Sequence, residues 1–177
     1  MNMVYPLLYV IAAMIVGFVM VKTYQEKDRM RRYVIVLLAL AMICIVSYSV
    51  NFMTDNYNVM SAATSIMMSA QDFLLVSLFI YTTAFARISN KVTKVMTIAA
   101  FVIAIIDSVV FIANIFNEIA VKYSLVKCDG IYVLGYEGEL WFGIHAVMSM
   151  IITACIIAVL VIKCIHIPGA YWGRYIV

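Results

Sequence analysis

Long apolar runs alternate with short polar segments along the whole chain. Backbone amides cannot stay unpaired in hydrocarbon, so apolar runs of this length predict membrane-spanning helices. Each run is long enough to cross a bilayer core of about 30 Å at about 1.5 Å per residue. The predicted spans are residues 5–21, 33–53, 59–86, 95–116 and 141–162. The pattern therefore predicts an all-α, polytopic transmembrane bundle of five helices, forming a single domain over residues 1–177.

The connection between the fourth and fifth spans, residues 117–140, is the only extended one. Two segments within it, 121–126 and 131–136, flank Asp129 and Gly130, a dipeptide suited to a tight turn. The chemistry of this turn favours a small β-hairpin lid over the outer mouth of the bundle. A loop without regular structure is the alternative.

Composition excludes the other broad classes of protein. The chain is 67% hydrophobic and 12% charged, more apolar than a soluble domain or a disordered segment of this length. The net charge of +3 gives no indication of a nucleic-acid partner. The partner that composition does predict is the lipid bilayer. The first run has no basic region before it and no small-residue cleavage site, so we expect a retained helix.

The placement of lysine and arginine predicts the orientation. Three alternate polar segments are basic: Lys22, Lys27, Arg29, Arg31 and Arg32; Arg87, Lys91 and Lys94; Lys163 and Arg174. The opposite side carries mostly acids: Asp55, Glu118, Asp129, Glu137 and Glu139, with Lys122 and Lys127. Basic segments stay in the cytoplasm. We therefore expect a multi-pass protein of the plasma membrane with its N-terminus outside and its C-terminus in the cytoplasm.

Acidic residues lie midway along two spans, where a carboxylate is costly. Asp72 lies in the third span and Asp107 in the fourth, both near the expected midplane of the bilayer. Polar residues recur at helical spacing in the second to fifth spans, and such faces converge on a shared interior. They are Ser47 and Asn51; Ser61, Ser65, Ser69 and Asp72; Asp107 and Asn114; His145, Ser149 and Thr153.

Two interpretations of these polar faces remain open. One is a pocket for a small molecule or ion, open to the outside, with Asp72, Asp107, Asn114 and His145 as ligand-binding residues. Asn114 and His145 would then meet in a vestibule above the aspartates, and Trp141 with the 117–140 loop would gate it. The other is hydrogen-bonded contact between helices, which we favour for the serines.

Signs of enzyme, metal or cofactor chemistry are absent from the sequence. There is no G-x-x-x-x-G-K-[ST], H-E-x-x-H or G-x-S-x-G motif. The thirteen methionines form no cluster with histidine and are expected to fill apolar space. The four cysteines, Cys44, Cys128, Cys155 and Cys164, make no C-x-x-C pair, and we predict no structural disulfide. We expect no catalytic residue, metal site or cofactor in this chain.

The fifth span and its C-terminal flank carry the motifs of a known family. Trp141, Phe142 and His145 match a W-F-x-x-H motif that opens the fifth helix. Pro168, Tyr171 and Arg174 approximate a P-x-x-Y-x-x-Q/R stretch before the sixth. The chain thus resembles the N-terminal seven-helix input domain of bacterial histidine kinases, which also precedes diguanylate cyclases. Asn114 matches that family's T-N-x-x-H pattern in the fourth helix, with Asn117 in place of the histidine.

This resemblance implies a membrane-embedded sensor. A small extracellular ligand would bind the bundle and relay its signal to a kinase or cyclase output domain in the same polypeptide. It implies two further helices, so we expect the chain to be a truncated piece of a longer protein. Sensors of this kind usually act as homodimers. The alternative function is a transporter or channel subunit that uses the midplane carboxylates; an embedded enzyme ranks third.

Overall fold

The computed structural model describes residues 4–88, 90–128 and 131–165. The five predicted spans are confirmed as helices: α1 (Val4–Gln25), α2 (Arg31–Val50), α3 (Tyr57–Ala86), α4 (Lys91–Asn117) and α5 (Leu140–Ile165). Each is long and apolar enough to cross a membrane. The predicted second span ran to residue 53, but α2 ends at Val50 and a turn follows. The Pro168, Tyr171 and Arg174 motif lies outside the described residues, as does Trp172.

Side-chain caps begin two of the helices. The Asn56 side chain accepts hydrogen bonds from the backbone N–H groups of residues 58 and 59 at the start of α3. Asn90 accepts one from Thr93 at the start of α4. Such caps pair backbone donors that have no partner within the first turn. They set the starts of α3 and α4, and hence the register of their interior faces.

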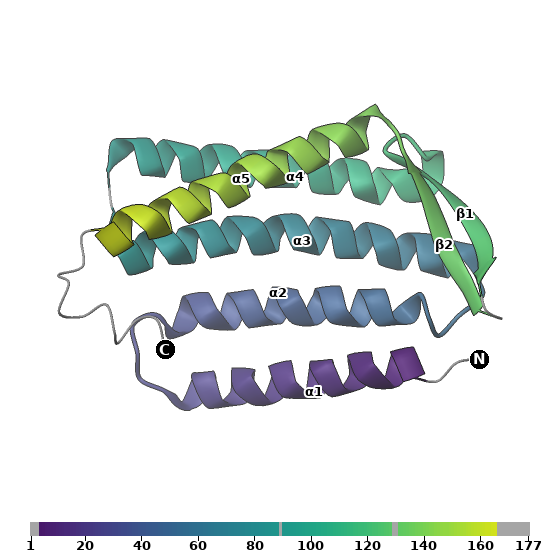
Figure 1. The fold of residues 1–177 in the computed structure, drawn as a ribbon, viewed down its shortest axis with the longest axis horizontal. Helices are drawn as coiled ribbons and strands as arrows, with labels where there is room; N and C mark the ends of the chain where they lie inside the picture. The colour runs from purple at the N-terminus through teal and green to yellow at the C-terminus, as the bar shows by residue number, and fades with distance from the viewer. Residues whose placement is uncertain (1–3, 89, 129–130, 166–177) are drawn as a thin grey trace.

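Helix α3 is the centre of the bundle. It packs against α2 on one side and against α4 and α5 on the other, while α1 contacts α2 at the edge (Figure 1). Helix α5 crosses α4 obliquely in this view (Figure 1). Helix α3 is also the most buried span, whereas α1 has no buried residue in its most apolar window. Polar residues therefore concentrate on α3 and the helices beside it, and α1 presents apolar side chains all round.

The predicted hairpin is confirmed. Strands β1 (Val121–Cys128) and β2 (Ile131–Gly138) pair antiparallel in register from Val121–Gly138 to Cys128–Ile131. The turn dipeptide Asp129–Gly130 lies outside the described residues. The base of the hairpin is anchored in the bundle, because Ala120, Val121 and Tyr123 are buried against Phe111 of α4. The hairpin lies across one end of the bundle (Figure 1).

Gly138, the last residue of β2, allows the hairpin to approach α5 closely. A Cβ atom at this position would lie 2.5 Å from Cδ1 of Phe142. Any other residue would therefore displace the Phe142 ring. Because Gly138 has no side chain, the end of the hairpin can lie directly against the first turn of α5.

The two groups of charged residues lie at opposite ends of the bundle. The connections from α1 to α2 and from α3 to α4 and the C-terminal end of α5, which carry the basic residues, lie at the end away from the hairpin, whereas the connection from α2 to α3 shares the hairpin end (Figure 1). This is the separation that the orientation argument requires. Which end faces the cytoplasm stays a prediction.

Cysteines make no disulfide in the described part of the chain. Cys44, Cys155 and Cys164 are free. The side chain of Cys128 lies outside the described residues.

Candidate functional site

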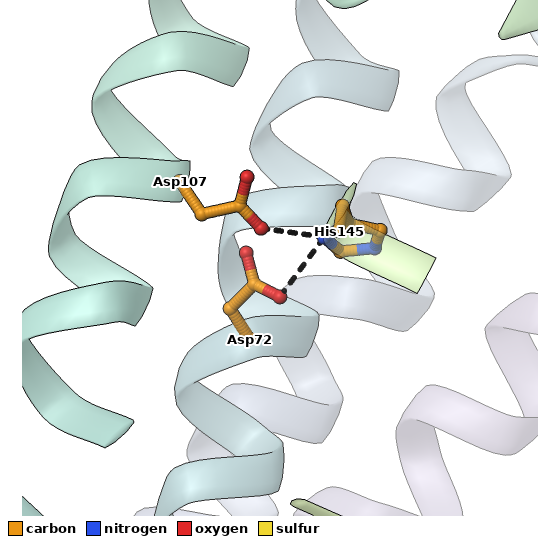
Figure 2. Close-up of side chains that lie close together, drawn as sticks. All are labelled: Asp72, Asp107 and His145. Atoms are coloured by element: carbon orange, nitrogen blue, oxygen red, sulfur yellow. Dashed lines mark hydrogen bonds and ion pairs between the residues drawn. The ribbon is translucent and has the colours of Figure 1, made fainter. Parts of the chain in front are cut away.

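Three buried ionisable side chains from three helices meet inside the bundle. Asp72 of α3, Asp107 of α4 and His145 of α5 are each at most 7% exposed. Figure 2 shows the two carboxylates facing the same edge of the imidazole ring. His145 Nδ1 lies 2.6 Å from Asp107 Oδ2 and 3.3 Å from Asp72 Oδ1. Nδ1 therefore lies within hydrogen-bonding reach of both acids, and a proton on it can bridge them.

Trp141 completes the surroundings of Asp107. Its indole Nε1 donates a hydrogen bond of 2.7 Å to Asp107 Oδ1, the oxygen that His145 does not contact. Trp141 and His145 are four residues apart, so they share one face of α5. Asp107 therefore holds one donor on each oxygen, and its carboxylate has a defined orientation.

Aromatic rings surround the imidazole and connect it to the hairpin. Phe111 meets the His145 ring edge-on at 5.0 Å, and Phe142 stacks on it at 6.0 Å between centroids. Tyr136 of β2 contacts Phe142 at 5.9 Å. A displacement of the hairpin would thus reach His145 through one intervening ring.

Asp72 is the incompletely paired member of the group. Its Oδ2 atom is buried and has no hydrogen-bond partner in the described structure. His145 is the only cationic side chain that forms an ion pair with either acid among the described residues. Two acids share one imidazole and Asp72 Oδ2 has no donor, so the cluster retains capacity for a positive charge or another donor.

Asn114 lies elsewhere than we expected. Its Oδ1 accepts hydrogen bonds from the backbone N–H groups of Ala120 and Val121, and its Nδ2 donates to the Val121 carbonyl. The side chain is fully buried. Asn114 and His145 therefore do not form the expected vestibule. His145 contacts the two aspartates, whereas Asn114 bonds to the backbone at the base of the hairpin.

The remaining polar faces make local hydrogen bonds. Asn51, which follows the last residue of α2, donates to Thr64 of α3 and so joins two helices, as the interhelical interpretation expected. Ser69 donates to the carbonyl of Ser65 in its own helix. Ser149 and Thr153 line a groove between α3 and α5, and His145 lies at the same groove.

The sequence identified all five candidate residues, but it did not predict which of them contact one another. Asp72, Asp107, His145 and Trp141 form one connected group, and Asn114 does not join it. The four-residue spacing of Trp141 and His145 was the available signal that both point at one neighbour. The possibility of metal ligation was missed, because its three donors lie on separate helices. The carboxylate oxygens and the imidazole nitrogen lie within 4.8 Å of one another, a spacing that allows one ion to be shared.

Comparison with known proteins identifies the family. A family model described as the N-terminal 7TM region of histidine kinase matches residues 7–177. No curated protein and no solved structure matches the sequence. The match covers nearly the whole chain, and all five described helices could span a membrane. The chain is therefore a multi-pass membrane protein that belongs to the family of N-terminal seven-transmembrane regions of histidine kinases.

Proposed function

We propose that this sensor input region binds a small extracellular ligand at the cluster of Asp72, Asp107, His145 and Trp141. The observation that carries the proposal is that two buried acids, Asp72 and Asp107, share a single histidine and Asp72 Oδ2 has no partner in the described structure. Ionisable groups inside a membrane are costly and mark functional sites. The hairpin stands at the end where such a ligand would enter.

Signal relay follows from the positions of the three helices. The cluster joins α3, α4 and α5, so a ligand that changes its contacts changes how these helices fit together. A ligand shifts such an equilibrium only through different affinity for the two arrangements. The cytoplasmic ends of the helices would pass the shift to a kinase or diguanylate cyclase output domain in the same polypeptide, within a homodimer.

The intact protein in its host cell tests this function. Asp107→Asn and His145→Gln should each change the basal output, measured as phosphohistidine or cyclic diguanylate in membranes. Asp55→Asn, an exposed acid between α2 and α3, is the matched control and should leave the output unchanged. Wild-type output in both site variants, at equal expression, would contradict the proposal.

The proposed orientation has a separate test. Single cysteines at Lys127 and at Arg29, in a background without native cysteines, report the two ends of the bundle. A membrane-impermeant maleimide should label the Lys127→Cys variant in intact cells and the Arg29→Cys variant only after lysis. The reverse pattern would place the N-terminus in the cytoplasm.

A further inference from the structure

The donor set of the buried cluster points to one class of ligand. We propose that Asp72, Asp107 and His145 bind a divalent first-row transition-metal ion, such as Zn²⁺ or Mn²⁺. The ion would be held by two carboxylate oxygens and the imidazole Nδ1. This inference rests on the proposed function, since the metal ion would be the ligand that is sensed.

Geometry supports a shared ion. The three donor atoms come from three helices and lie within 4.8 Å of one another. Donors about 2.0–2.2 Å from a common ion lie at most about 4.4 Å apart, and the distances of 2.6 and 3.3 Å from His145 Nδ1 to the two carboxylates fall below this limit. The imidazole favours transition metals over Mg²⁺ and Ca²⁺, and the absence of a thiolate from the set disfavours soft ions such as Cu⁺.

Charge supports a divalent ion over a proton on His145 alone. With both acids ionised, a single imidazolium leaves one carboxylate charge uncompensated in the bundle interior. A divalent cation beside a neutral imidazole balances both carboxylates.

Trp141 has the position of an orienting residue. It donates to Asp107 Oδ1 and leaves Oδ2 directed at His145. Hydrogen bonds from outside the ligand set fix ligand orientation in metal sites, and their loss weakens metal affinity by roughly 10–100-fold. His145 also lines a groove of about 540 Å³ between α3 and α5 together with Gln71 and Phe142.

The test uses the full-length protein, purified in detergent without a histidine tag and dialysed against metal-free buffer. Zn²⁺, Mn²⁺ or Co²⁺ is then added, and bound metal is measured by elemental analysis and by visible absorption of Co²⁺. The wild type should bind metal stoichiometrically. Asp72→Asn, Asp107→Asn and His145→Gln should each weaken binding at least about 10-fold, and Trp141→Phe by roughly 10–100-fold. The Asp55→Asn control should bind as the wild type does.

A rescue variant separates a ligand from a structural histidine. His145→Cys supplies a thiolate at the same position, so its Co²⁺ complex should show a thiolate-to-metal charge-transfer band that the wild type lacks. Metal binding equal to wild type in all three ligand variants, or none in the wild type, would overturn the metal site. If no metal binds but Asp107→Asn changes output, the metal inference fails and the sensor function stands. If metal binds but neither added metal nor the three ligand variants change the output, the metal site is supported and the sensor function fails.

Discussion

Two buried polar sites lie on the same face of α4, and they differ in how completely they are paired. Asn114 uses both polar atoms of its amide in three hydrogen bonds to the backbone of Ala120 and Val121. Asp107, seven residues earlier, belongs to a group in which two acids share one histidine and Asp72 Oδ2 lacks a partner in the described structure. Both sites were candidates for ligand binding on the same grounds of type and spacing.

The difference shows how to separate structural from functional polarity inside a membrane protein. The Asn114 amide oxygen accepts two backbone hydrogen bonds and its nitrogen donates a third, which leaves one N–H group and makes its main contribution one to folding. A charged cluster with an open acceptor is expensive for stability alone and retains binding capacity. The predictions below test this division, from the largest expected change in the free energy of unfolding to the smallest.

Asn114→Ala should destabilise the protein most. The variant leaves two N–H groups and one carbonyl buried without partners, and each such group costs about 1–3 kcal/mol. We expect the free energy of unfolding to fall by about 3 kcal/mol or more, measured by circular dichroism during denaturation in mixed micelles. Asn58→Ala, exposed on α3, is the control. A loss below about 1 kcal/mol would show that Asn114 is not the anchor of the hairpin.

Asp107 and His145 should be coupled to each other. In a double-mutant cycle of Asp107→Asn and His145→Gln, residues in direct contact should show a coupling energy of about 0.5–3 kcal/mol. The cycle of Asn114→Ala with His145→Gln should give a smaller coupling, because these two described residues share no direct hydrogen bond and are connected only through the rings of Phe111 and Phe142. Comparable coupling energies in both cycles would show that the two sites belong to one network.

Tyr57→Phe tests the outer support of the hairpin base. The Tyr57 hydroxyl donates a hydrogen bond to Glu118, which follows α4 at its C-terminus. Since this bond is exposed, its removal should cost about 1 kcal/mol or less in the same unfolding measurement. Tyr24→Phe, at the opposite end of the bundle, should have no effect. A loss of unfolding free energy as large as that of Asn114→Ala would show that the exposed bond between Tyr57 and Glu118 anchors the hairpin as strongly as Asn114 does.

Lys122→Ala should have the smallest effect. Lys122 pairs with Glu139 across the base of the hairpin, and that carboxylate raises the pKa of Lys122. The pair contributes below the ordinary pKa of lysine and is lost as pH rises through the raised value. Both side chains are exposed, so salt screens the attraction. Melting curves of variant and wild type should converge at high salt; a difference that persists would indicate a role beyond charge.

Much of the architecture was predictable because it depends on local properties of the chain. Apolar runs of sufficient length predicted all five helices, and a turn dipeptide between alternating segments predicted the hairpin strands. The end of α2 was misplaced by three residues, because Phe52 and Met53 are apolar but form a turn. Hydropathy does not distinguish an apolar turn from another helical residue.

The candidate site was predictable only as a set of residue types. Spacing placed Asp107 and Asn114 on one face, and the tertiary structure assigned one to an ionic cluster and the other to the hairpin backbone. That assignment depends on how α5 crosses α3 and α4, which no sequence period encodes. The amino-acid sequence by itself determined which polar groups enter the membrane. Only the packing of three helices decided which of them meet, because contacts between helices depend on their crossing and rotation.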